Sequence, residues 1–86
     1  MKNLQQYVDQ KNAWETILGR KALDINTPAD RQSIARSIDN DMSPENLTCD
    51  GEASMSHVRS RAKLLNAAAR ELKALDPTVD FYEVEA

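Results

Sequence analysis

The two side chains best suited to covalent or acid–base chemistry are Cys49 and His57. A thiol attacks as a thiolate, which needs a nearby imidazole or cation to form at neutral pH. The acids Asp50 and Glu52 act in the other direction, because neighbouring negative charge opposes thiolate formation. No third residue is placed to orient His57 as a base. We therefore expect no catalytic residue and no enzyme, with Cys49 idle or buried and His57 at the surface near a helix start.

Phosphate and metal chemistry is also poorly supported. The only glycines are Gly19 and Gly51, so the sequence contains neither a P-loop nor a dinucleotide-binding fingerprint. The run 39–43 resembles the start of a calcium loop, but Pro44 takes the glycine position and Asp50 the position of the bidentate glutamate. One cysteine and one histidine cannot build a cysteine–histidine zinc cage. We expect no metal and no cofactor.

Basic residues form the clearest candidate for binding a charged ligand. The segment 39–53 carries only acids, whereas 55–75 carries several bases and the single acid Glu71. On a helix, part of this basic set shares one face that could contact phosphates in a nucleic-acid groove. The bases are Arg59, Arg61, Lys63, Arg70 and Lys73.

Pairing with the acidic segment is a simpler role for these bases, because exposed charge runs are mostly solvated or paired. The connection between the helices expected over 28–40 and 55–75 is also far longer than the turn of about three or four residues in a helix-turn-helix. Binding of nucleic acid is therefore the alternative function and not the leading one.

Aromatic side chains are scarce, and they are the other candidates for recognising a partner. We expect Tyr7, Trp14, Phe81 and Tyr82 to complete the core. If the tail does not fold back, Phe81 and Tyr82 become an exposed acidic–aromatic peptide, and aromatic residues dominate binding hot spots. The residues expected at a protein-binding surface are Arg59, Lys63, Arg70, Phe81 and Tyr82.

The elements that must position these residues follow from apolar spacing. Apolar residues three and four positions apart predict a helix over about 3–22, with one stripe facing a core. The stripe consists of Leu4, Tyr7, Val8, Trp14, Ile17 and Leu18. Thr27 and Pro28 form a helix-start signal and predict a second helix over about 28–40. Its inward face should hold Ile34 and Ile38, and Asp39 should face water.

The strongest helical signal covers about 55–75, which is rich in alanine, leucine and basic residues. The pair Asp76-Pro77 should end this helix, because proline disfavours helical geometry in the residue before it. Between the second and third helices, 43–54 has turn chemistry, and 77–86 forms an extended tail. The expected fold class is all-α, a small bundle of three main helices with a structured central loop.

Length and composition limit the remaining alternatives. The chain has 86 residues and a formal net charge of −3, which fits one domain over 1–86 and argues weakly against nonspecific nucleic-acid binding. No stretch has the length and apolarity of a membrane span, and the start lacks a secretory signal. We expect a cytoplasmic location and no membrane partner.

These observations predict a small protein-binding module that acts as an adaptor, inhibitor or regulatory subunit. A short acidic helical chain without an enzyme motif is similar in style to the small accessory proteins of bacteria, phages and plasmids. The expected partner is another protein, and a homodimer through the first and third helices is an open alternative.

Overall fold

Three α-helices make up most of the chain. The computed structural model describes residues 2–43, 46 and 55–81. Its helices are α1 (Lys2–Ile17), α2 (Pro28–Met42) and α4 (Met55–Leu75), and the described residues contain no strand. The predicted all-α bundle of three main helices is thereby confirmed. Most of the central loop 43–54 lies outside the described residues, as do the last residues of the tail.

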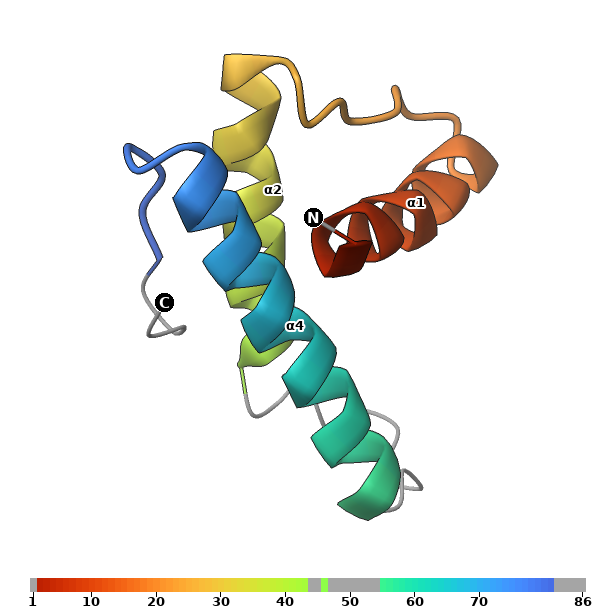
Figure 1. The fold of residues 1–86 in the computed structure, drawn as a ribbon. Helices are drawn as coiled ribbons and strands as arrows, with labels where there is room; N and C mark the ends of the chain where they lie inside the picture. Colours follow the sequence, from red (N-terminus) through yellow and green to blue (C-terminus); the bar gives the residue numbers. More distant parts are fainter. Residues whose placement is uncertain (1, 44–45, 47–54, 82–86) are drawn as a thin grey trace.

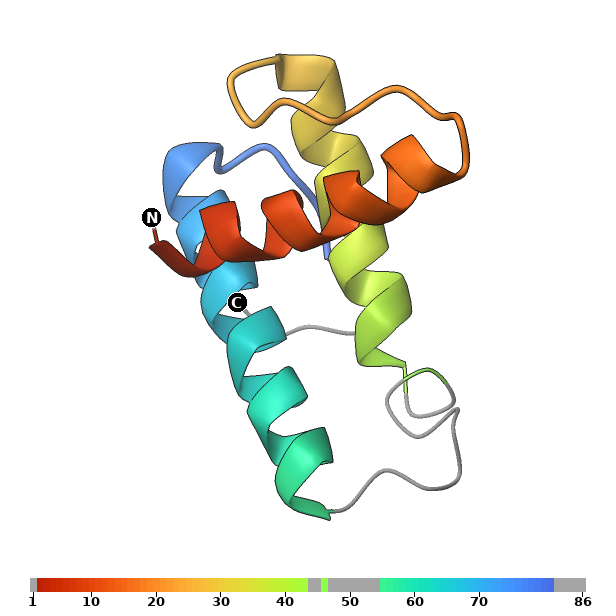
Figure 2. The same cartoon turned by 90° about the vertical axis from the view of Figure 1, so that its right-hand side faces the viewer.

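The three helices are arranged as a pair crossed by a third. Helices α2 and α4 lie side by side and run in opposite directions, and α1 crosses over them (Figures 1 and 2). Helix α4 packs against both α1 and α2. The second half of α1 projects away from the pair (Figure 1). Helix α4 is therefore the common support of the fold, and it supports only part of α1.

The core lies where α1 crosses the pair. The residues with the smallest exposed fractions come from all three helices and from the segment after α4. Ala68 and Ala69 are fully buried, and small side chains at these positions let the neighbouring helices approach α4 closely. The buried apolar residues are Leu4, Tyr7, Val8, Ile34, Ala35, Ile38, Leu65, Ala68, Ala69, Leu72 and Val79.

Helix α1 ends at Ile17, five residues before the predicted end. Gly19 has a φ of +74°, a left-handed conformation that glycine adopts without a steric penalty. The Gly19 N–H donates to the Thr16 carbonyl at 3.0 Å, and the Arg20 N–H donates to the Glu15 carbonyl at 2.7 Å. These two bonds form a Schellman motif, which satisfies the last carbonyls of the helix. The prediction of a helix to residue 22 is wrong because Gly19 serves as this stop signal.

Helix α2 begins at Pro28 as predicted and continues to Met42, two residues beyond the expected end. Thr27 has the extended backbone of an N-cap residue, but its side chain makes no capping hydrogen bond. Ile34 and Ile38 are buried as expected. Asp39 is only 6% exposed, so the prediction that it faces water is wrong. It follows Ile38 on the side of α2 that turns toward the other helices.

Helix α4 has its predicted bounds, and the chain after it folds back on the bundle. Lys73 Nζ donates to the Val79 carbonyl at 2.6 Å, and the Asp80 N–H donates to Gln32 Oε1 on α2 at 3.3 Å. Val79 is buried and Phe81 packs against the core. The tail is therefore docked on α2 and α4 as far as Phe81. Within the described residues, no helix has the length and apolarity needed to cross a membrane.

Candidate functional site

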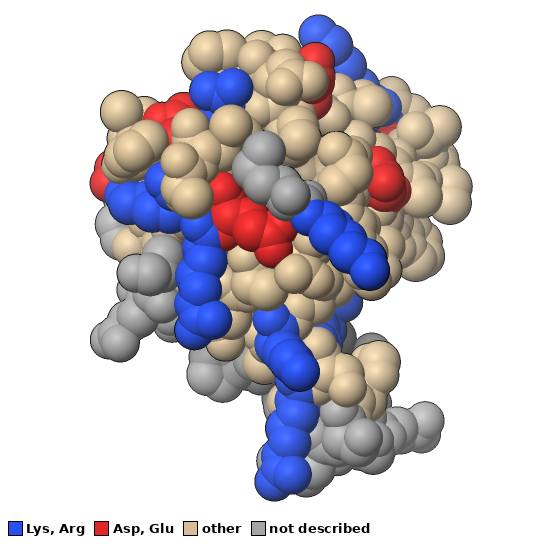
Figure 3. Space-filling view, in the orientation of Figure 1, with Lys and Arg blue, Asp and Glu red and all other residues tan. Residues whose placement is uncertain are grey.

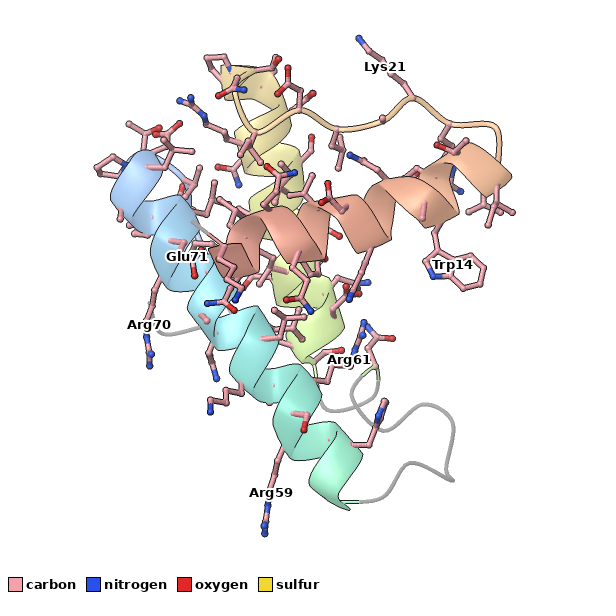
Figure 4. All side chains as sticks on the ribbon, turned by 45° about the vertical axis from the view of Figure 1, so that its right-hand side comes forward. Trp14, Lys21, Arg59, Arg61, Arg70 and Glu71 are labelled. Carbon is pink, nitrogen blue, oxygen red and sulfur yellow. The ribbon has the colours of Figure 1, made fainter. Side chains whose placement is uncertain are left out.

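Within the part of the chain that the structure describes, the large exposed apolar side chains gather at the end of α1. Trp14, Ile17 and Leu18 are 65%, 73% and 59% exposed, and we call these three residues the Trp14 surface. They continue the stripe that begins with the buried residues Leu4 and Tyr7. The prediction that the whole stripe faces the core is therefore wrong for its second half. Helix α1 projects past its supporting helices there, and Trp14 points into solvent (Figure 4).

A polar junction marks the boundary between the buried and the exposed halves of the stripe. The Tyr7 hydroxyl donates to Asp41 Oδ2 at 2.8 Å and shares a hydrogen bond of 2.7 Å with Ser37 Oγ. Arg61 of α4 pairs with the same Asp41 oxygen at 3.6 Å. Burial raises the pKa of Tyr7, and the Asp41 charge raises it further, so the hydroxyl stays protonated. The junction ties all three helices together.

A pocket of about 160 Å³ opens between this junction and Trp14. Its residues come from α1, α2 and α4 and combine an aromatic wall with two cations and one acid. The lining residues are Tyr7, Gln10, Lys11, Trp14, Asp41 and Arg61. Asp41 already accepts from Tyr7 and pairs with Arg61. The polar groups left to meet a ligand here are therefore the donors of Lys11 and Arg61 and the side-chain amide of Gln10.

The other end of α1 is fixed by α4. Glu71 Oε1 accepts the backbone N–H of Leu4 at 3.0 Å, and Oε2 accepts the Asn3 side-chain amide at 2.8 Å. Partial burial would raise the pKa of Glu71, but these hydrogen bonds outweigh that effect and the pKa is lowered. Figure 4 shows Glu71 between the start of α1 and α4. This carboxylate replaces a local N-cap residue and holds the first turn of α1 on α4.

The basic residues of α4 fall into two groups. Arg59, Lys63 and Arg70 are exposed. Arg59 and Arg70 project on the side of α4 away from Arg61, which points toward the polar junction (Figure 4). Basic side chains extend along the outer face of α4, with an acidic patch among them (Figure 3). Lys73 is engaged with the tail. The five expected bases therefore do not form one continuous face.

The remaining candidates are placed as follows. Phe81 is half-buried against the core, whereas Tyr82 lies outside the described residues. His57 is exposed in the first turn of α4, and Cys49 also lies outside the described residues.

Sequence reasoning missed the Trp14 surface, although Gly19 carried a signal for it. A helix stop at Gly19 places Ile17 and Leu18 at a helix end, where fewer neighbours can cover them.

Comparison with known protein families, with curated protein sequences and with solved structures finds no significant match for this chain.

Proposed function

We propose that this protein binds another protein through the Trp14 surface, in the role of an adaptor, inhibitor or regulatory subunit. The observation that carries the proposal is the exposure of Trp14, Ile17 and Leu18 on neighbouring turns at one end of α1. Scattered exposed apolar residues are ordinary, but a contiguous group of large ones is typical of an interaction site. Tryptophan is also among the residues most enriched at binding hot spots.

Burial of this surface would contribute substantially to the free energy of binding. Full burial of a large apolar side chain contributes about 1.5–3 kcal/mol relative to full exposure. The three side chains are more than half exposed, so covering them supplies about 4 kcal/mol, or roughly a thousandfold in dissociation constant. The Schellman turn fixes Ile17 and Leu18, and thus little backbone ordering is needed on binding.

The test is capture of partners from lysate by the purified chain and by two variants. Trp14→Ala removes the largest exposed apolar side chain, and Thr16→Ala is the matched control. Thr16 is exposed on α1 two residues from Trp14, a spacing that puts it on another face of the helix. We expect a defined protein that survives nuclease treatment, is retained by Thr16→Ala and is lost with Trp14→Ala. A protein retained equally by both variants would contradict the proposal.

Binding of nucleic acid through α4 is the second candidate function. It is favoured by the exposed row of Arg59, Lys63 and Arg70, which spans about 16 Å along the helix axis. Three phosphate contacts predict that log K falls with log salt with a slope of about −2 to −3. The test is a salt titration with labelled duplex and single-stranded DNA, using the charge-removal variant Arg59→Gln/Lys63→Gln. Unchanged affinity in that variant would exclude this row as the binding site.

A further inference from the structure

We propose that the partner presents an acidic side chain to the pocket beside Trp14, flanked by apolar side chains that cover Ile17 and Leu18. The inference rests on the proposed function and adds the chemistry of the partner to it. The occupant is therefore a short acidic and apolar segment of another protein.

The charges in the pocket wall select an acid. Lys11 brings an ammonium group from α1, and Arg61 brings a guanidinium group from α4. Among the described residues, Asp41 is the one acid in the wall, and its carboxylate already meets the Tyr7 hydroxyl and Arg61. Arg61 has five N–H donors and a side chain that is 40% exposed, so it retains donors for a second carboxylate. A carboxylate entering the pocket would thus meet two cations.

The aromatic wall strengthens such a contact. Trp14 lines the same pocket as Lys11 and Arg61, and a bound apolar segment would cover its ring and exclude water. Charge-assisted hydrogen bonds gain strength where water is excluded, because the local dielectric constant falls. The pocket and the Trp14 surface therefore act as one site, in which apolar contact provides most of the affinity and the carboxylate provides orientation.

A second copy of this chain fits the site poorly. In a two-fold dimer the same surface faces itself. The acids of α1 and of the described pocket wall are Asp9, Glu15 and Asp41. Glu15 pairs with Arg20 at 3.6 Å and Asp41 with Arg61 at 3.6 Å, whereas Asp9 is exposed and does not line the pocket, and it accepts a hydrogen bond from Gln5 Nε2 at 2.8 Å. Self-pairing would bring Lys11 and Arg61 of both copies together, and the one acid of the described pocket lining, Asp41, is already engaged in each copy. A different protein with an acidic segment is the better complement.

The test is selection from a phage-displayed library of random peptides against the full chain. We expect enriched peptides in which aspartate or glutamate stands beside large apolar residues. Their affinity should fall at least about tenfold with Lys11→Glu, because like charges then face each other across the contact. A peptide with its acid replaced by lysine should regain affinity for Lys11→Glu. The matched control is Lys21→Glu, the same charge reversal at an exposed lysine that projects on the other side of α1 from Trp14 (Figure 4).

The outcomes separate this inference from the proposed function. Peptides that lose binding with Trp14→Ala but lack an acid, and that ignore Lys11→Glu, would overturn the acidic partner and leave protein binding intact. The absence of any enriched peptide that depends on Trp14 would overturn both. Light scattering of the chain alone provides a further readout: a dimer that Trp14→Ala converts to a monomer would identify a second copy as the occupant and overturn the acidic partner.

Discussion

Replacing Tyr7 by phenylalanine isolates the contribution of the polar junction to stability. The Tyr7 side chain is 4% exposed, and its ring lies in the core. Tyr7→Phe keeps that ring and leaves no large cavity, so only the hydroxyl is lost. The hydroxyl makes two hydrogen bonds to α2, with Asp41 at 2.8 Å and with Ser37 at 2.7 Å. Any loss of stability therefore measures how strongly these bonds hold α1 on α2.

The expected loss is about 2 kcal/mol. A hydrogen bond to a charged group contributes about 1.5–3 kcal/mol and a neutral one about 0.5–1.5 kcal/mol. Asp41 keeps its ion pair with Arg61 in the variant, and the half-buried Ser37 can turn toward water. The total loss should therefore lie near the sum of the two lower limits. A chain of this size has a total stability of about 4–13 kcal/mol. The loss corresponds to a fall in Tm of about 8–16 °C.

The assay is thermal unfolding followed by circular dichroism at neutral pH. Ser37→Ala removes one partner of the Tyr7 hydroxyl and should lie between the parent chain and Tyr7→Phe. Ser33→Ala changes an exposed serine on the same helix and should not lower Tm, because alanine is the better helix former. The double variant Tyr7→Phe/Ser37→Ala should cost less than the sum of the single changes, because both remove the same bond. A Tm for Tyr7→Phe equal to that of the parent chain would refute the reasoning.

Alkaline pH provides a second readout of the same group. Burial raises the pKa of Tyr7 in the folded chain above its unfolded value of about 10. Above about pH 10 the unfolded state releases this proton first, so stability falls as pH rises further. Tyr7→Phe lacks the group, and the difference in stability between the two chains should shrink over this range. A difference that stays constant above pH 10 would contradict the assigned environment of Tyr7.

Three further predictions concern other parts of the molecule. Glu71→Ala should cost about 1 kcal/mol, as loss of a helix cap does. Folding lowers the pKa of Glu71. The carboxylate therefore contributes fully to stability above its unfolded pKa of about 4.3, and this contribution is lost as pH falls through the folded pKa. The stabilities of the parent and variant chains should converge when both are titrated to acid pH. Gly19→Ala should cost about 1 kcal/mol in urea unfolding, through the positive φ alone, since an added Cβ meets nothing within 4 Å; an unchanged midpoint would contradict the Schellman turn. Trp14→Ala should change stability by less than about 0.5 kcal/mol, whereas Leu72→Ala at a fully buried site should cost about 2–5 kcal/mol; a comparable loss from both in denaturant unfolding would show that Trp14 is buried.

Local signals in the sequence predicted much of the fold. Pro28 marked the start of α2, Asp76-Pro77 marked the end of α4, and apolar spacing identified all three helices. These signals work because caps, proline and helical periodicity act within a few residues. The helix stop at Gly19 is equally local. A glycine within a helical pattern can, however, either end the helix or be tolerated in its interior, and only the positive φ of Gly19 identifies it as a helix end.

The candidate site depends on long-range placement, which local signals do not contain. Apolar spacing places Trp14, Ile17 and Leu18 on one face of α1. How much of that face another helix covers depends on where α1 crosses α2 and α4. Long-range placement also explains why Arg61 and Arg59 have different environments. Both are arginines on one helix, and only the position of Asp41 makes the first a partner of the polar junction.

The central claim is that the Trp14 surface is uncovered in the chain alone and covered by its partner. Trp14 is the only tryptophan, so its fluorescence reports on this surface alone. The most direct measurement is its emission maximum and its quenching by iodide, with and without a selected acidic peptide that lacks tryptophan. We predict a water-exposed emission that iodide quenches readily in the chain alone, and a shift to shorter wavelength with protection on binding. A protected Trp14 in the chain alone, or an emission unchanged by a peptide that binds, would contradict the account.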